Sequence, residues 1–429
     1  MTKRMVMIDD NIQDASGHYL ELSHMLAKAA ANSGLPVILA THKNFEPDDE
    51  TLQLCQVYPI FKTTKMIRWS LGANGKSSYP RDIKGNISGA PSVAKLSQII
   101  FESFRHPSRK AKNMLIEWSN SFREFLDTAK ITEEDLLILN TADDFTLLAM
   151  AAALSNHKNQ SFNCHLIFHF STNDKQTKSG RVKNDPMRSQ IEVALRCLKN
   201  HRVTIHTTTE ELKHEINAVM NRDIANAIPY PTRICRISEG VNNTPCKATF
   251  AGMPRAEKGK HSIHQFLENL EHHQLIGDSK YQPSLQLPRK HWRSVVPKTM
   301  HHYCADNKIE VITSHLSTEA YQKWLDQTGI GIFLYDPIRY QSRCSGVLLE
   351  MLCRGIPVIV PASCWLSSQV ESAGGNGTVG YIYQNTNEIP MLLKRFLSER
   401  NQINKNSRIF SEKVMKMHVS DRTLEKMNL

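Results

Sequence analysis

The stretch from Gly331 to Pro361, GIFLYDPIRYQSRCSGVLLEMLCRGIPVIVP, determines the class of fold. Its apolar ends predict two buried strands, at 330–334 and 357–360, and the segment between them predicts a polar loop followed by a helix. Ser345 is a good N-cap for that helix, and Gly355 can end it before the second strand. The stretch therefore predicts a strand, helix and strand unit of a parallel sheet.

The start of this helix predicts an anion site. In such a unit the free N–H groups at Ser345 and Gly346 lie at the carboxyl edge of the sheet, where the helix dipole favours a phosphate. Glu350 follows about one and a half turns later and could accept hydrogen bonds from the hydroxyls of a ribose. The alternative is that Ser345 only caps a crossover helix and that Glu350 is a solvated charge.

The same residues resemble the C-terminal half of GT-B glycosyltransferases, in particular the retaining group whose signature is a Glu, seven residues and a second Glu. The end of the signature is intact at Glu350 and at 354–358, RGIPV, whereas Ser342 stands where the first Glu would be. The resemblance implies an α/β fold of two Rossmann-like doubly wound domains that face each other across a cleft. It also implies that the C-terminal domain binds a nucleotide-sugar and that the second Glu faces the ribose.

Length and composition fit a globular protein of this kind. A chain of 429 residues predicts two domains of about 200 residues each, and 40% hydrophobic with 22% charged residues is ordinary for globular proteins. The 53 Lys and Arg against 42 Asp and Glu give a net charge of +11, which suits a nucleic acid, an anionic membrane surface or a phosphorylated substrate. Because no nucleic-acid-binding motif accompanies this charge, we expect no nucleic acid as a partner.

Cysteine usage and the N-terminus indicate a compartment. Nine Cys are scattered without a CxxC pair, which is typical of reduced thiols in a cytoplasmic protein and not of a zinc site. The start MTKRMVMIDD leads directly into a strand, and no window approaches the roughly 18 apolar residues of a membrane span. We expect a cytoplasmic protein without metal or cofactor, whose only membrane contact would be peripheral, at the inner face.

The N-terminal region begins with a β-α-β pattern, a strand at 4–8, a helix at 19–31 and a strand at 36–40. Gly17 and His18 lie in the turn that leads into the helix and could cover a ligand, although an ordinary turn explains them equally well.

The span from Lys43 to Ser92 is irregular, and a segment of this length is usually functional or partly disordered. Its cations and Trp69 could meet an anionic acceptor or lipid headgroups, the alternative being a solvated loop.

From Asp135 to Asn221 strands and helices alternate repeatedly, which predicts a doubly wound parallel sheet with ligands at the carboxyl ends of its strands. His169 follows one such strand and would face the predicted cleft; a purely structural imidazole is the alternative. Since the resembling family has a cleft His near the donor sugar here, His169 is the catalytic candidate.

The sequence predicts four segments. An N-terminal acceptor domain covers 1–232, a linker covers 233–247, and the nucleotide-sugar domain covers 248–405. In the resembling family the last helix crosses back to the first domain, which would apply here to 406–429. Helices are expected at 292–304, 388–397 and 405–418.

The second domain opens with a strand at 248–252, after which Arg255 and Lys258 follow in a loop at the carboxyl edge of the sheet. Two cations there could bracket a diphosphate opposite the helix start at Ser345, the alternative being a solvated loop. The family carries a Gly-Arg...Lys-Gly pattern at this place; the Lys-Gly pair matches, but Met253 occupies the usual position of the Arg.

The leading hypothesis is a metal-independent, retaining glycosyltransferase of the hexosyltransferase type, acting in polysaccharide or cell-surface glycan synthesis. It would move a sugar from a nucleotide-sugar donor to a glycan, a lipid-linked acceptor or a small molecule. An epimerase, or an inverting transferase with His18 as its base, is the rival enzyme. The substitutions at Ser342 and Met253 also favour a catalytically silent protein that binds nucleotide-sugars or acts as a scaffold.

Overall fold

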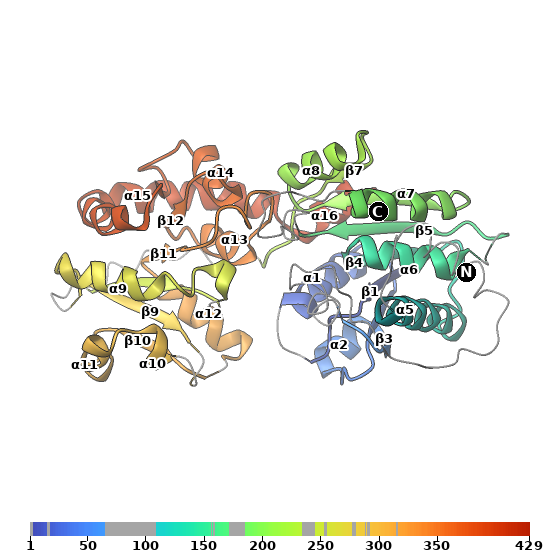
Figure 1. Ribbon diagram of the computed structural model, residues 1–429, viewed down its shortest axis with the longest axis horizontal. Coiled ribbons are helices and arrows are strands. Elements are labelled where there is room, and N and C mark those ends of the chain that lie inside the picture. The colour runs from blue at the N-terminus through green and yellow to red at the C-terminus, as the bar shows by residue number, and fades with distance from the viewer. Residues whose placement is uncertain are drawn as a thin grey trace. The chain divides into compact units, whose positions relative to one another are not determined.

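The computed structural model (Figure 1) describes residues 3–14, 18–64, 109–155, 157, 159–170, 185–233, 245–252, 255–276, 280–287, 289, 292–314 and 316–429. The chain forms two compact units. Unit 1 comprises Met1–Pro231 and Ser420–Leu429, and unit 2 comprises Thr232–Val419. Each unit is built on one parallel sheet, which confirms the prediction of two doubly wound α/β domains.

Unit 1 holds a seven-stranded sheet in the order β3-β2-β1-β4-β5-β6-β7. The elements in chain order are β1 (Met5–Asp9), α1 (His18–Asn32), β2 (Val37–His42), α2 (Asp49–Leu54), β3 (Gln56–Phe61), α5 (Arg109–Thr128), β4 (Leu136–Ala142), α6 (Asp144–Leu154), β5 (Asn163–Phe168), α7 (Asp185–Cys197), β6 (Arg202–Thr207), α8 (Glu210–Met220), β7 (Ala225–Ala227) and α16 (Ser420–Lys426). The strand order changes direction between β1 and β4, so loops at their carboxyl ends can diverge around a ligand.

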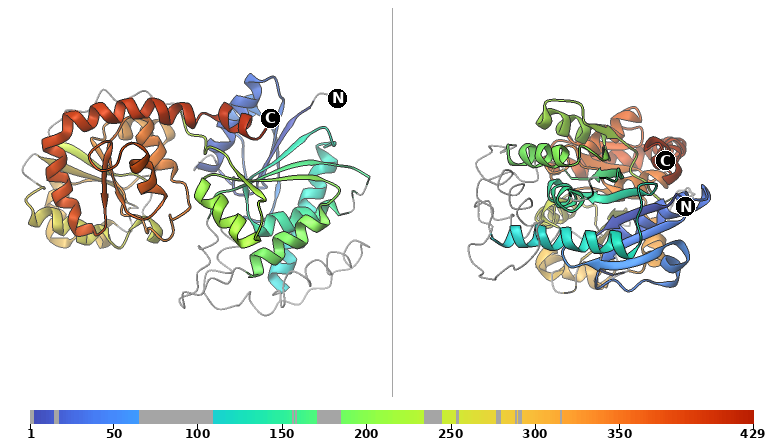
Figure 2. Two further views of the ribbon diagram at one scale, coloured as in Figure 1. Left: turned by 90° about the horizontal axis from the view of Figure 1, so that it is seen from above. Right: turned by 90° about the vertical axis from the view of Figure 1, so that its right-hand side faces the viewer.

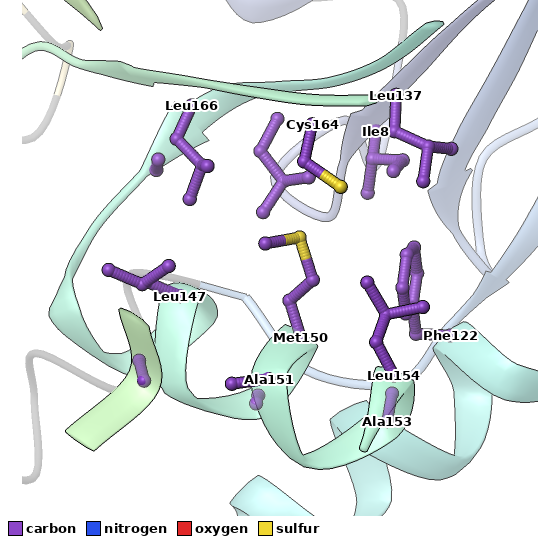
Figure 3. Packing of buried hydrophobic residues seen from close by; sticks show 14 of the residues in the cluster. Ile8, Phe122, Leu137, Leu147, Met150, Ala151, Ala153, Leu154, Cys164 and Leu166 are labelled. Atoms are coloured by element: carbon purple, nitrogen blue, oxygen red, sulfur yellow. The ribbon is translucent and has the colours of Figure 1, made fainter. Parts of the chain in front are cut away.

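Helices cover both faces of this sheet. On one face α6 is apolar around its whole circumference and lies buried between α5 and α7, where Met150 and Leu154 meet Leu137 and Cys164 of the strands (Figure 3). A helix that is hydrophobic on all sides needs such a buried place. On the other face α1 and α16 pack beside each other against the sheet (Figure 2).

The prediction that no regular structure follows Lys43 is wrong for its first part, because α2 and β3 lie there. Pro59 within β3 hides the strand from sequence patterns, since proline cannot donate to a sheet ladder. The structure resolves this conflict by placing β3 at the edge of the sheet. The predictions for 65–92 lie outside the described residues.

Unit 2 holds a six-stranded sheet in the order β10-β9-β8-β11-β12-β13. Its elements are β8 (Cys246–Phe250), η2 (Ala256–Lys258), α9 (Ile263–His272), β9 (Tyr281–Gln286), α10 (Trp292–Val295), η3 (Lys298–Met300), α11 (His301–Ala305), β10 (Glu310–Ile312), α12 (Thr318–Asp326), β11 (Ile330–Ile332), α13 (Gly346–Cys353), β12 (Val358–Pro361), α14 (Trp365–Ser372), β13 (Gly380–Tyr383), η4 (Thr386–Glu388) and α15 (Ile389–Met417). The central strand β11 leads to α13, as its sequence predicts.

Three expected helices differ from the structure. The predicted helix at 292–304 is divided into α10, η3 and α11, because Pro297 has no N–H group to continue the first of them. The predicted helices at 388–397 and 405–418 are one helix of 29 residues, α15, since no Gly or Pro interrupts the chain between them. The chain then enters α16, where Thr423 donates a hydrogen bond to the carbonyl of Pro229 at 2.9 Å.

None of the helices in the described part of the chain is both long and apolar enough to cross a bilayer.

Candidate functional site

The carboxyl edge of the sheet in unit 2 brings two loops together, one after β8 and one after β11. The turn η2 belongs to the first loop, and the Asp336 N–H of the second loop donates to the Glu257 carbonyl at 3.0 Å. Gly259 ends the turn at φ +77°, and a Cβ added there would lie 2.1 Å from the carbonyl oxygen of Leu334. Only glycine permits this approach, so Gly259 holds the turn against the end of β11.

Lys258, the last residue of η2, lies half-buried at this edge. Its Nζ lies 5.6 Å from the centre of the Tyr335 ring. A Cβ added at Gly252 would lie 3.2 Å from this Nζ, so the ammonium group passes close to the backbone of Gly252. Burial, and then the positive charges of Arg255 and Arg343, lower the pKa of Lys258 to about 8, against the opposing effect of the carboxylates nearby. An ammonium group in this position gains from an anionic partner.

The helix α13 begins near Lys258. Gly252 lies between the two: a Cβ added to it would be 3.2 Å from the Lys258 Nζ and 3.6 Å from Val347 in the first turn of α13. Ser345 is its N-cap and accepts a hydrogen bond from the Leu348 N–H at 3.3 Å. The N–H groups of Gly346 and Val347 have no intrahelical acceptor, as at the start of any helix. They add a partial positive charge to the same edge.

Glu350 lies on α13 close enough to raise the pKa of Lys258, so it belongs to the same electrostatic cluster. Burial, followed by the charge of the Glu350 carboxylate, raises the pKa of the Tyr321 phenol well above its usual value. Arg354 fixes the other end of α13: its guanidinium is 2% exposed and donates to Asp326 at 2.9 Å and to the Glu350 carbonyl at 2.9 Å. The Arg354 of the RGIPV sequence is therefore a structural residue.

A small pocket, partly open to solvent, lies at this edge. Its lining residues are Phe250, Ala251, Gly252, Lys258, Ile263, Leu285, Gln286, Ile332 and Tyr335. The walls are mostly apolar, and three polar groups, the ammonium of Lys258, the amide of Gln286 and the phenol of Tyr335, belong to them. Small-molecule sites typically have this composition.

The structure brings together all the site residues that the sequence predicts in unit 2, namely Arg255, Lys258, Ser345, Gly346 and Glu350. Sequence reasoning missed Arg343 and Tyr335. Arg343 lies in the polar loop, two residues before the predicted N-cap Ser345. A cation so close to the predicted anion site could have been recognised from the sequence.

The predicted residues of unit 1 lie at the carboxyl edge of its own sheet. His169 follows β5 and is half-buried. Its Nε2–H donates a hydrogen bond to the carbonyl of Asn140, and its ring packs edge-on against that of Tyr230 with 5.7 Å between the ring centres. His18 is the exposed first residue of α1. Gly17 lies outside the described residues, as does Met253. The functional roles of these histidines remain predictions.

Two buried carboxylates that the sequence analysis did not select lie at the end of β1. Asp9 accepts hydrogen bonds from the Asn11 backbone at 3.0 Å and from the Thr141 hydroxyl at 2.7 Å, and Asp10 accepts one from the Trp118 indole at 2.9 Å. Burial, followed by the charge of Asp10, raises the pKa of Asp9 to about 6. Among the residues that the structure describes, no group of three or more His, Cys, Asp or Glu side chains could hold a metal ion.

Replacing Asp9 by asparagine is expected to stabilise the protein at neutral pH. The folded-state pKa exceeds that of an unfolded Asp, so the ionised carboxylate lowers the free energy of unfolding once the pH rises from about 4 through 6. Asn at this position keeps an acceptor for Asn11 and can donate to Thr141. We expect a gain of about 1–3 kcal/mol at pH 8 that disappears near pH 4, measured by chemical denaturation across this range.

Asp135→Asn is the matched control. Burial alone would raise the pKa of Asp135, but the hydrogen bonds from Arg4, at 2.9 and 2.6 Å, the Thr132 N–H and the charge of Arg4 together outweigh burial and lower it. This substitution should therefore destabilise the protein at neutral pH. A loss of stability in both variants would mean that the hydrogen bonds to Asp9, and not its charge, determine its effect.

No protein-family model matches the chain, and no curated protein matches its sequence. Solved structures do match it over nearly its whole length. Sucrose-phosphate synthase from Thermosynechococcus elongatus is 13% identical with a TM-score of 0.61, and the match covers 99% of this chain and 97% of that one. Anabaena HepE in complex with UDP is 12% identical with a TM-score of 0.58, covering 99% of each chain.

A third match is the E. coli trehalose-6-phosphate structure bound with UDP-2-fluoro glucose, which is 10% identical with a TM-score of 0.59 and covers 99% of this chain and 98% of that one. Identities this low establish the fold alone. The chain therefore has the GT-B fold of these neighbours, and the sequence prediction of that fold is confirmed.

Proposed function

We propose that the protein is a glycosyltransferase that moves a sugar from a nucleotide-sugar donor to an acceptor. The observation that carries the proposal is a cluster of positive charge at the carboxyl edge of the unit 2 sheet: Lys258 lines a pocket there, and the charges of Arg255 and Arg343 act on it. The first turn of α13 lies beside Gly252, which lines the same pocket. Two neighbours of the same fold are complexes with UDP and with UDP-2-fluoro glucose, which supports a nucleotide-sugar as the ligand.

The chemistry that these residues can supply is the stabilisation of a leaving diphosphate. Breaking the bond between sugar and diphosphate leaves negative charge on the phosphate oxygens, and preorganised cations and helix N–H groups stabilise that charge most strongly. Arg255, Lys258 and the N–H groups at Ser345-Gly346 would do so without a metal ion. Glu350 would accept hydrogen bonds from the ribose hydroxyls.

Unit 1 would bind the acceptor, which we propose to be a glycan, a lipid-linked sugar or a small molecule. His169 and the turn at Gly17-His18 remain the residues proposed to meet the sugar, and retention of configuration remains part of the proposal. Synthesis of a polysaccharide or a cell-surface glycan in the cytoplasm, with peripheral contact at the inner face of the membrane, is the proposed role.

A catalytically silent nucleotide-sugar-binding or scaffolding protein is the second candidate. Ser342 favours it, because a buried serine stands where the Glu of the resembling signature would contact the donor sugar. The two candidates share the nucleotide site but differ in turnover.

The test is a thermal-shift screen with UDP, GDP, ADP, CMP, TDP and their sugars, followed by an assay of nucleotide release from any sugar that binds. One nucleotide should raise the Tm of the wild type, because a ligand at a hundredfold excess over Kd stabilises the folded state by about 2.7 kcal/mol. Lys258→Ala should abolish the shift, whereas Lys405→Ala, which changes an exposed lysine of α15, should keep it.

Binding together with Lys258-dependent nucleotide release would identify an enzyme. Binding without release, in the presence of a range of acceptors, would favour the silent protein. A screen in which no nucleotide binds the wild type would contradict both candidates.

A further inference from the structure

The phenol of Tyr335 is a buried polar group at the proposed nucleotide site that no described residue satisfies. Tyr335 follows β11 closely, is 5% exposed and lines the pocket with Lys258. Its hydroxyl oxygen has no hydrogen-bond partner in the part of the chain that the structure describes. Leaving a buried hydroxyl unpaired is costly, so such groups usually have a ligand or another function.

Aromatic neighbours fix the ring of Tyr335. The Tyr340 ring lies 4.5 Å away in a tilted contact, and the Phe333 ring lies 5.2 Å away edge-on. Contacts of this kind hold a ring in one orientation, so the hydroxyl cannot easily turn out to water.

The hydroxyl of Tyr335 also lies near Ser345, the N-cap of α13. Ser345 is close enough to favour the ionised phenol, yet no hydrogen bond of acceptable geometry joins the two residues. Burial, followed by the nearby phenol of Tyr340, raises the pKa of Tyr335 well above its usual value, so the group keeps its proton. It is therefore a neutral donor beside an ammonium group and a helix start.

We propose that the Tyr335 hydroxyl donates a hydrogen bond to a phosphoryl oxygen of the ligand, between Lys258 and the first turn of α13. The inference rests on the proposed function and identifies Tyr335 as a further binding residue of that site. The ligand class is a diphosphate, because a tetrahedral oxyanion can accept from a phenol, an ammonium group and backbone N–H groups at once. The mostly apolar walls lower the local dielectric constant and so strengthen each of these bonds.

The experiment compares Tyr335→Phe with Tyr383→Phe, a second buried tyrosine of unit 2 whose hydroxyl donates to the Phe333 carbonyl at 2.9 Å. Calorimetry measures the binding of inorganic pyrophosphate and of the nucleoside diphosphates to each folded variant. Tyr335→Phe should weaken both by about 10- to 100-fold, as expected for a hydrogen bond to a charged group, and should leave the Tm unchanged or raised. Tyr383→Phe should lower the Tm and change the affinities by less than about twofold.

The outcomes separate this inference from the function on which it rests. Unchanged affinities in Tyr335→Phe would overturn the role of Tyr335 while the nucleotide site stands. A fall in Tm as large as that of Tyr383→Phe would show a structural hydroxyl and overturn it too. Pyrophosphate binding that depends on Tyr335, without binding of any nucleotide, would support the phosphate contact and overturn the nucleotide-sugar function. Failure of the wild type to bind either ligand would overturn both.

Discussion

Replacing Gly259 by alanine is expected to lower the free energy of unfolding by about 2–5 kcal/mol and to weaken nucleotide binding at the same time. The positive φ alone costs a residue with a Cβ about 1–2 kcal/mol. The new methyl group would in addition lie 2.1 Å from the Leu334 carbonyl oxygen and 2.5 Å from the Leu334 Cβ, so the backbone of the turn must shift at a further cost of about 1–3 kcal/mol. Denaturation by urea and calorimetric titration with a nucleotide measure the two effects.

Gly375→Ala is the matched control, because it also places a Cβ on a residue of positive φ but brings that Cβ into contact with no other atom. Gly375 lies in the same unit at φ +86°, and an added Cβ would have nothing within 4 Å. We expect a loss of about 1–2 kcal/mol and an unchanged nucleotide affinity. Equal losses in the two variants would show that the turn moves away from Leu334 at no cost, and an unchanged affinity in Gly259→Ala would show that Lys258 does not depend on the turn.

The class of fold could be predicted from the sequence because its strongest signals are local. Each strand of a parallel sheet is a short apolar run, and each connecting helix has its own caps, so β11 and α13 are visible without any knowledge of their neighbours. β3 was not visible, since its Pro59 is compatible with a strand only at the edge of a sheet, and the position of a strand in a sheet depends on contacts distant in sequence. The sequence predicts two helices in place of α15 for a related reason: the polar central turns of α15 resemble a loop when they are considered alone.

The candidate site was predictable to the extent that a motif or a strand end marks it. Lys258 and Ser345 lie in the loops that follow two strands of the sheet, and the rule that ligands bind at the carboxyl ends of parallel strands selects them. Tyr335 also follows a strand, but a tyrosine in that position usually packs in the core, and only its orphaned hydroxyl distinguishes it. Asp9 could not be selected from the sequence either. Its raised pKa results from burial and from the charge of Asp10, and only the presence of Asp10 can be read from the sequence.

Nucleotide affinity is expected to fall as the pH rises above about 8. In the free protein the pKa of Lys258 is lowered to about 8 by burial and by the nearby guanidinium groups. A bound diphosphate favours the ammonium form and raises that pKa, so binding takes up a proton wherever the free lysine is neutral. The affinity should be constant from pH 7 to 7.5 and then decrease about tenfold per pH unit between the two pKa values, because each bound ligand requires one more proton.

Lys258→Arg tests whether this one group causes the slope. Arginine side chains stay charged throughout this range, so the variant should bind with nearly constant affinity from pH 7 to 9.5. Calorimetry at pH 8.5 in two buffers of different ionisation enthalpy should detect proton uptake in the wild type and little in the variant. The same slope in both proteins would mean that another group titrates on binding. A wild-type affinity that stayed constant to pH 9.5 would mean that Lys258 keeps its charge in the free protein throughout this range. That result would contradict a pKa near 8 for this lysine.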